Sequence, residues 1–184
     1  MRAGNCVNQY KNDKIENKEK IIFNFDFKKE WEYENGFYLT SDTSRLAKIL
    51  AHWELYKKII NLPGDVVECG VFKGASLLRF ATYREIMESQ NSRKIIGFDA
   101  FGIFPKRTSS TEDLAFINSF EKDCGNGISK TELEEVLRYK LIYNVELVQG
   151  DICNTLPTYL FKNPFLKSPS CISTSMCMNL QNIA

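Results

Sequence analysis

The stretch PGDVVECGVFKGASLLRF, from Pro63 to Phe80, contains the residues whose types and spacing best suit a ligand. Glu68, Gly70 and Gly74 follow the pattern Glu-x-Gly-x-x-x-Gly between an apolar run and a helical pattern. Glycines in such a turn let the backbone approach a ligand closely, and the amino end of the following helix favours a carboxylate or phosphate. The pattern therefore predicts a small-molecule cofactor site.

Two acids follow later apolar runs in the same way. Asp99 comes after KIIGF and is placed to accept hydrogen bonds from both hydroxyls of a ribose. Asp151 comes after VELVQG and is placed to reach an adenine amino group or a neighbouring ligand group. An acid after a strand is often only a helix cap, so each acid alone is a weak signal. Their ordered occurrence at successive strand ends is a much stronger one and favours a nucleoside cofactor.

The spacing of the glycines helps to decide between NAD and S-adenosylmethionine as the cofactor. The dinucleotide pattern G-x-G-x-x-G is not matched, because the glycines here lie further apart. An acid inside the first turn, at Glu68, suits a nucleoside with a positive sulfonium better than a pyrophosphate. The residues therefore favour S-adenosylmethionine, and a fragment of an NAD-type Rossmann enzyme is a weaker alternative.

The elements that must position these residues alternate between strand and helix. The run TSDTSRLAKILAHWELYKKII has apolar residues at helical spacing, and Ser41 or Asp42 can cap it. Alternation of this kind predicts a parallel sheet with right-handed crossovers, which is an α/β fold. Three strands with their helices make one half of a doubly wound sheet. The predicted strands are Asp65–Cys69, Lys94–Phe98 and Val145–Gln149. Later helices are predicted in GASLLRFATYREIMESQ, EDLAFINSF and SKTELEEVLRY, and the last of these has a capping box of Ser129 and Glu132. A further short helix follows the third strand, and Pro157 can start it.

Composition excludes several function classes. A formal charge of +1 gives no electrostatic reason to expect nucleic acid or an anionic membrane, and no apolar run approaches the roughly 18 residues of a membrane span. The six cysteines contain no C-x-x-C pair, which argues against zinc or a disulfide framework and for reduced, cytoplasmic thiols. The lone His52 has no carboxylate partner in view, which favours a structural or surface histidine over a catalytic one.

Three segments together resemble the macrocin O-methyltransferase family: GDVVECGVFKGASLLRFA, IIGFDAFGIFP and VELVQGDICNTLPTYL. FEKDCGNGISKTELEEVL also resembles the insert of family members described as dTDP-6-deoxy-L-hexose 3-O-methyltransferases. The resemblance implies a Rossmann-like class I methyltransferase, a three-layer α/β/α fold with a parallel sheet. It also implies an S-adenosylmethionine-dependent enzyme that methylates a sugar hydroxyl, on a nucleotide- or glycan-linked deoxyhexose.

By this resemblance Glu68, Gly70 and Gly74 line the methionine end of the cofactor, with Ser76 beside them. Asp99 would hold the ribose, and Asp151 the adenine side. Relatives often carry an acid after the aromatic residue of DAFGIFP, which this chain lacks, so one substrate-side contact is in doubt. Family members often oligomerise, so a homo-oligomer is consistent with the resemblance.

The segment 168–184 departs from the family. Relatives continue with a buried strand and an acidic cluster, close to LLHLDVDVYEPTK, whose acids bind the divalent metal (Mg²⁺) that orients the sugar hydroxyls. This chain instead reads SPSCISTSMCMNLQNIA, without a carboxylate or a strand pattern. The predicted organisation is a polar lead-in over 1–36, of which 1–20 is expected to have weak structure, a partial methyltransferase domain over 37–167 and an unstructured, aberrant tail over 168–184.

The genetic code supports a reason for this departure. When the third base of each codon is joined to the first two of the next, Met176–Cys177 must give valine and Met178–Asn179 must give glutamate. The neighbouring codons permit the rest of LLYLDVDVYEPAK, the metal motif in register. This indicates a one-base deletion near the codon of Lys167, whereas a natural polar tail is the simpler alternative.

A truncated domain of this kind would leave the strand Asp65–Cys69 with an unpaired apolar edge and without catalytic metal ligands. We therefore expect no turnover by this chain, with a non-catalytic cofactor-binding or regulatory module as the alternative function.

Overall fold

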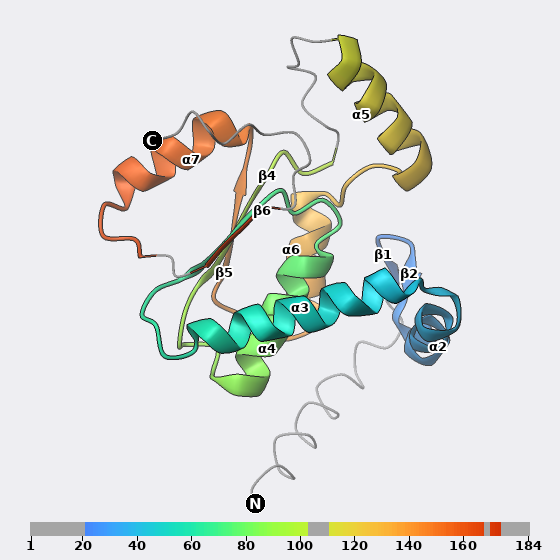
Figure 1. Cartoon of the computed structure of the whole chain (residues 1–184), viewed down its shortest axis with the longest axis horizontal. Helices are drawn as coiled ribbons and strands as arrows, with labels where there is room; N and C mark the ends of the chain where they lie inside the picture. The colour runs from blue at the N-terminus through green and yellow to red at the C-terminus, as the bar shows by residue number, and fades with distance from the viewer. Residues whose placement is uncertain (1–20, 103–110, 168–169, 174–184) are drawn as a thin grey trace, which may run out of the picture.

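The computed structural model describes residues 21–102, 111–167 and 170–173. Its centre is a parallel four-stranded sheet with the strand order β5-β4-β3-β6. The strands are β3 (Val66–Cys69), β4 (Ile95–Asp99), β5 (Val145–Gln149) and β6 (Ser170–Ser173). Helices cover both faces of this sheet (Figure 1), so the predicted α/β architecture is confirmed.

One face of the sheet carries the larger part of the core. Buried side chains of α3 (Thr43–Ile59), α4 (Ala75–Met87) and α6 (Lys130–Tyr139) form one hydrophobic cluster with residues of the strands. The opposite face is covered by α7 (Ile152–Lys162), which packs on Val67, Ile96 and Phe98. The helix α5 (Thr111–Cys124) lies beyond the upper end of the sheet (Figure 1).

Two of the predicted helix starts are confirmed by the structure, and one is wrong. Asp42 caps α3 by accepting from the Ser44 amide at 2.8 Å, and Ser129 and Glu132 form the predicted capping box of α6. Pro157 was expected to start a short helix, but α7 begins at Ile152 and contains Pro157 in its interior. The reason is that Asp151 accepts a hydrogen bond from the Cys153 amide and so starts the helix earlier.

The part of the predicted polar lead-in that the structure describes, residues 21–36, is folded. Residues 21–36 contain a short hairpin of β1 (Ile21–Ile22) and β2 (Phe25–Asp26), a 3₁₀ turn (Phe27–Lys29) and the first part of α2 (Glu30–Thr40). Ile22 is only 2% exposed, and the rings of Phe27 and Tyr139 lie 4.3 Å apart. Ile22 and Phe27 of this run thus pack on the core and against α6, and their burial orders the segment. Residues 1–20 lie outside the described residues.

The edge of β3 was expected to be unpaired, and this is wrong. β6 pairs in parallel with β3 over its whole length, with Val66 opposite Ser170 and Cys69 opposite Ser173. The Asp65 amide also donates to the Lys167 carbonyl at 2.8 Å. A fully buried strand must pair its backbone groups on both sides, and this requirement outweighs the weak strand pattern of SCIS. Of the expected unstructured tail, Ser170–Ser173 is therefore a strand, and 174–184 lie outside the described residues.

A glycine in β4 sets the distance between α4 and the sheet. A Cβ atom at Gly97 would lie 2.5 Å from Leu77 Cδ1 and 2.9 Å from Val71 Cγ2. Gly97 therefore lets α4 lie close to the strands, and α4 carries one side of the predicted site.

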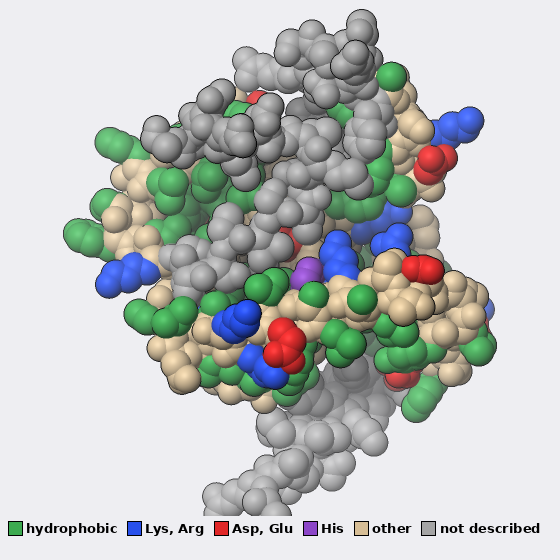
Figure 2. All heavy atoms as spheres, viewed as in Figure 1, with side chains coloured by type: hydrophobic (Ala, Val, Ile, Leu, Met, Phe, Trp, Pro, Cys, Tyr) green, Lys and Arg blue, Asp and Glu red, His purple; other side chains and the backbone are tan. Residues whose placement is uncertain are grey.

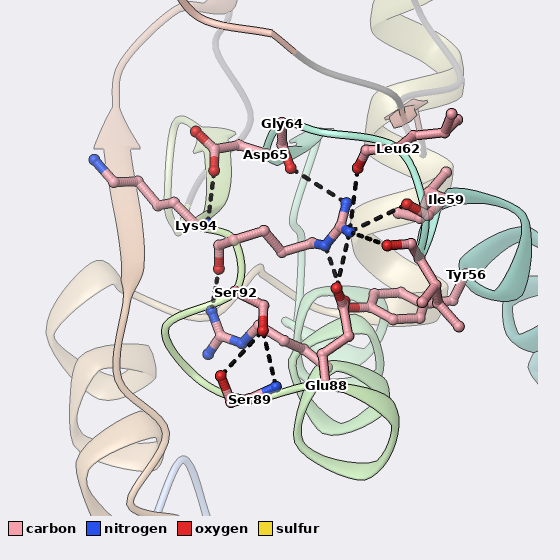
Figure 3. A network of polar contacts seen from close by, with 12 residues as sticks. Tyr56, Ile59, Leu62, Gly64, Asp65, Glu88, Ser89, Ser92 and Lys94 are labelled. Carbon is pink, nitrogen blue, oxygen red and sulfur yellow. Dashed lines mark hydrogen bonds and ion pairs between the residues drawn. The ribbon is translucent and has the colours of Figure 1, made fainter.

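The other end of the sheet is fixed by a buried arginine between α4 and β4. Arg93 donates to both carboxylate oxygens of Glu88 at 2.9 Å, and Tyr56 donates its hydroxyl to Glu88 as well. The Arg93 guanidinium also donates to backbone carbonyls at the end of α3 and in the turn before β3, at 3.1–3.3 Å (Figure 3). The carbonyls belong to Ile59, Ile60, Leu62 and Gly64. Burial by itself would raise the pKa of Glu88, but the hydrogen bonds from Arg93 and Tyr56 hold that pKa below its ordinary value.

Within the described part of the chain, no helix is long and apolar enough to cross a membrane.

Candidate cofactor site

The six residues predicted for the cofactor lie at or just beyond the carboxyl ends of β3, β4 and β5. Gly70 follows β3 and Gly74 precedes α4, and both have a positive φ, of 87° and 79°. The Gly70 amide donates to the Phe98 carbonyl at 2.8 Å, so the turn stays hydrogen-bonded to β4. A Cβ atom at Gly74 would lie 2.9 Å from Leu133 Cδ1, so the turn is packed against α6 as well. The glycines thus make a tight strand-to-helix turn at the edge where ligands of parallel sheets bind.

Glu68 is the most unusual side chain at this edge. It is 1% exposed, and its Oε1 accepts a hydrogen bond from the hydroxyl of Ser76 in the first turn of α4. Its Oε2 is buried and has no hydrogen-bond partner among the described residues. Burial raises the pKa of Glu68 to about 8. The hydrogen bond from Ser76 and the positive charges of Lys48 and Arg79 lower this pKa, but by less than burial raises it. A buried acceptor without a partner is costly in a folded protein and suits a cationic or donor group of a ligand.

Asp99 shapes the glycine turn. Its Oδ2 accepts from the amides of Val71 at 2.7 Å and Phe72 at 2.9 Å, and its Oδ1 accepts from the Phe101 amide at 2.7 Å. A carboxylate offers about four acceptor positions, so three backbone bonds leave room for a ligand hydroxyl. The side chain therefore fixes the turn to the end of β4 and can still bind one more donor.

Asp151 acts as a helix cap in this structure. Its carboxylate accepts from the Cys153 amide at 2.9 Å and starts α7, the alternative role that the sequence left open. The preceding Gly150 donates its amide to the Asp99 carbonyl at 2.9 Å, which ties the ends of β4 and β5 together. The structure thus places Asp151 at the same edge as Asp99 without showing a ligand role for it.

Two basic side chains that act electrostatically on Glu68, Lys48 and Arg79, also act on the only histidine, and sequence reasoning did not assign any of the three to the site. His52 of α3 is 7% exposed, and its Nδ1 lies 3.0 Å from Nη1 of Arg79 in α4. Burial, followed by the charges of Arg79 and Lys48, lowers the pKa of His52 to about 4. The histidine, shown in purple, lies with Lys or Arg side chains beside it at the centre of the face in Figure 2. One signal was available in the sequence, because Ser76 and Arg79 are three residues apart and so share one face of a helix.

Two cavities among the described residues have linings that include neither Glu68 nor Asp99, although Lys73 and Arg79 line the second. One, of about 340 Å³, is lined by Asp65, Lys94 and the end of α7, at the amino ends of the strands. The other, of about 440 Å³, lies between the β1–β2 hairpin and helices α4 and α6. Neither contains Glu68 or Asp99 in its lining, so the geometry of the strand ends, rather than either cavity, defines the candidate site.

The described residues fit a divalent metal poorly. They contain no group of three or more His, Cys, Asp or Glu side chains that could hold a metal ion. The hard cation Mg²⁺ needs oxygen ligands, of which carboxylates are the main protein source.

No curated protein sequence matches the chain. Three solved structures share its fold at low identity. The calicheamicin methyltransferase CalS11 is 20% identical with a TM-score of 0.52, and the match covers 94% of this chain and 68% of that chain. The apo form of CalS11, described as a TDP-rhamnose 3'-O-methyltransferase, is 21% identical with a TM-score of 0.50, and the match covers 94% of this chain and 67% of that chain. The O-methyltransferase NovP is 20% identical with a TM-score of 0.52, and the match covers 60% of this chain and 48% of that chain.

The family comparison covers most of the domain. The sequence model of the macrocin O-methyltransferase family (TylF) matches residues 42–164 of the chain. These residues include α3, the glycine turn and the ends of β3, β4 and β5. The sequence resemblance is thereby confirmed: the chain belongs to the macrocin O-methyltransferase family.

Proposed function

We propose that the chain binds S-adenosylmethionine at the carboxyl ends of β3, β4 and β5, and that its intact domain methylates a hydroxyl of a deoxyhexose. The observation that carries this proposal is the buried Glu68 carboxyl, whose Oε2 has no partner among the described residues, next to a turn of two positive-φ glycines. The methionine end of S-adenosylmethionine has an ammonium group, which is the kind of donor that such an oxygen lacks. A pyrophosphate would bring negative charge to the same place.

The residues of the chain take the following roles in this proposal. Glu68 accepts a hydrogen bond from the ammonium of the methyl donor, and Ser76 holds the carboxyl in position. Gly70 and Gly74 let the backbone approach the methionine end, while Asp99 uses its remaining acceptor position for a ribose hydroxyl. Asp151 lies on the adenine side. The bound cofactor supplies an electrophilic methyl group on its sulfonium, and the protein contributes binding and orientation.

The sugar substrate is proposed from the family and from one similar structure. Macrocin O-methyltransferases act on sugars, and CalS11 is described as a TDP-rhamnose 3'-O-methyltransferase. A nucleotide-linked deoxyhexose is therefore the substrate class to test first, and a glycan-linked one is the second. Mg²⁺ is expected from the family, but its ligands would have to come from residues other than those that the structure describes.

We also propose that the 184-residue chain has little or no turnover because its reading frame changes near Lys167. The strand β6 gives this idea some support. Ser170–Ser173, which pairs with β3, spans the codons whose shifted reading permits the family strand LLYL. In this proposal the restored frame would keep a strand beside β3 and would add the carboxylates that follow it.

A methylation assay tests both proposals together. We expect the frame-restored protein to transfer a labelled methyl group from S-adenosylmethionine to one member of a panel of dTDP-linked deoxyhexoses, in a reaction that EDTA abolishes. We expect the 184-residue chain to bind S-adenosylhomocysteine but to transfer no methyl group. Methylation by the purified 184-residue chain would refute the proposed loss of turnover. Failure of the frame-restored protein on both nucleotide- and glycan-linked sugars would refute the proposed substrate class.

A further inference from the structure

The methionine end of the proposed cofactor has a second charge that the predicted site residues leave without a partner. Glu68 suits the ammonium group, but the carboxylate beside that group also needs hydrogen-bond donors when it leaves water. Resting on the proposed function, we infer that Arg79, held in place by His52, binds this carboxylate. Arg79 would then distinguish the complete amino-acid group from truncated thioether nucleosides.

The geometry of α4 places Arg79 on the helix face that carries Ser76. Ser76 in the first turn of α4 contacts the Glu68 carboxyl, and Arg79 is three residues further along the same helix. Residues three apart lie on one face of a helix, and helical side chains lean toward the amino terminus. Arg79 therefore lies on the same face of α4 as Ser76 and near enough to Glu68 to lower its pKa electrostatically, and it also lines the cavity beside the β1–β2 hairpin.

His52 fixes the orientation of the guanidinium. An arginine is always a donor, so the 3.0 Å contact between Arg79 Nη1 and His52 Nδ1 means that Nδ1 accepts and the ring proton is on Nε2. The low pKa of His52, about 4, which results mainly from burial, keeps the ring neutral for this purpose. The imidazole is itself held by packing, since its ring lies 5.0 Å from that of Phe80. One N–H of the guanidinium is thus used for positioning, and a carboxylate can take a parallel pair of the others.

Arg79 is not the counter-ion that satisfies Glu68. No hydrogen bond joins the two side chains in the described structure, and Glu68 Oε2 is left without a partner although Arg79 and Lys48 both act electrostatically on Glu68. Lys48 is exposed, whereas Arg79 is partly buried, so water screens the lysine more strongly. The Glu68 carboxyl and the Arg79 guanidinium are therefore both available to a ligand that carries an ammonium and a carboxylate on the same carbon.

Calorimetric titration with three probes tests the inference. S-adenosylhomocysteine has both charged groups, its decarboxylated analogue keeps only the amine, and 5′-methylthioadenosine has neither. We expect Arg79→Met to weaken S-adenosylhomocysteine binding about 10- to 100-fold, the usual effect of losing a charge-assisted hydrogen bond, and to leave the affinity for the other two probes unchanged. Arg79→Lys, which keeps the charge, should recover part of the affinity.

A matched variant and the remaining outcomes make the test decisive. Lys57→Met removes a cation from the surface of α3, where Lys57 pairs with Glu54 at 2.8 Å, and should change none of the three affinities. An equal loss for all three probes in Arg79→Met would mean that Arg79 only supports the fold, and an unchanged affinity for S-adenosylhomocysteine would mean that it does not contact the carboxylate. Either result overturns the inference while the proposed function stands. Failure of the wild-type chain to bind any of the probes would overturn both.

Discussion

Replacing Arg93 with methionine should lower the free energy of unfolding by about 3–5 kcal/mol, the usual cost of breaking a buried ion pair. Methionine keeps much of the side-chain volume but leaves the Glu88 carboxylate without its bidentate partner. It also removes the donor for four backbone carbonyls around the end of α3. Urea unfolding followed by circular dichroism measures this loss as a shift of the midpoint at constant slope.

The next residue offers a matched control. Lys94 forms an ion pair with Glu146 at the same 2.9 Å distance, but the two side chains are 41% and 40% exposed. Lys94→Met should therefore cost less than about 1 kcal/mol. A similarly small effect in Arg93→Met would contradict the view that the buried network holds the turn before β3. The double variant Arg93→Met/Glu88→Gln should lose less than the sum of the single losses, because no uncompensated charge is left.

The second large effect concerns the pH dependence of stability and comes from Glu68. Its pKa is about 8 in the folded protein, above an ordinary value of 4.5, chiefly because the carboxyl is buried. Between these two values the unfolded chain has released the proton and the folded chain keeps it. The contribution of Glu68 to stability is therefore fully present below pH 4.5 and is lost as the pH rises toward 8.

Glu68→Gln should remove this dependence, because glutamine does not titrate. From pH 5 to pH 8 the wild-type chain should lose roughly a few kcal/mol of stability relative to the variant. His52 acts in the opposite sense, since its lowered pKa costs stability as the pH falls below its ordinary value of 6.5, but both proteins contain it and the difference cancels its effect. Parallel stability curves for the two proteins over this range would show that Glu68 is not a buried, protonated group.

The parts of the fold that sequence predicted well are those set by local pattern. The strand runs VVEC, IIGFD and VELVQ are short and largely apolar, and the spacing of Gly70 and Gly74 fits a turn between a strand and a helix. The positions of Glu68 and Asp99 at the carboxyl ends of their strands follow from these local patterns and from the parallel topology.

The features that sequence missed depend on contacts between distant residues. β6 is a strand because β3 needs a partner, and nothing in SCIS itself demands that conformation. The bond between His52 and Arg79 joins residues 27 apart on two helices, and no local pattern indicates their relative rotation. The ordering of the β1–β2 hairpin likewise depends on its burial against α6, which becomes visible only when the helices are in place.

The central claim is that the strand ends of this chain form a site for the methyl donor and not for a dinucleotide. Calorimetric titration of the purified wild-type chain with S-adenosylhomocysteine and, separately, with NADH tests it most directly. The account predicts saturable binding of S-adenosylhomocysteine at one site per chain, weakened in Glu68→Gln, and no binding of NADH. Saturable binding of NADH, or S-adenosylhomocysteine binding that Glu68→Gln leaves unchanged, would contradict it.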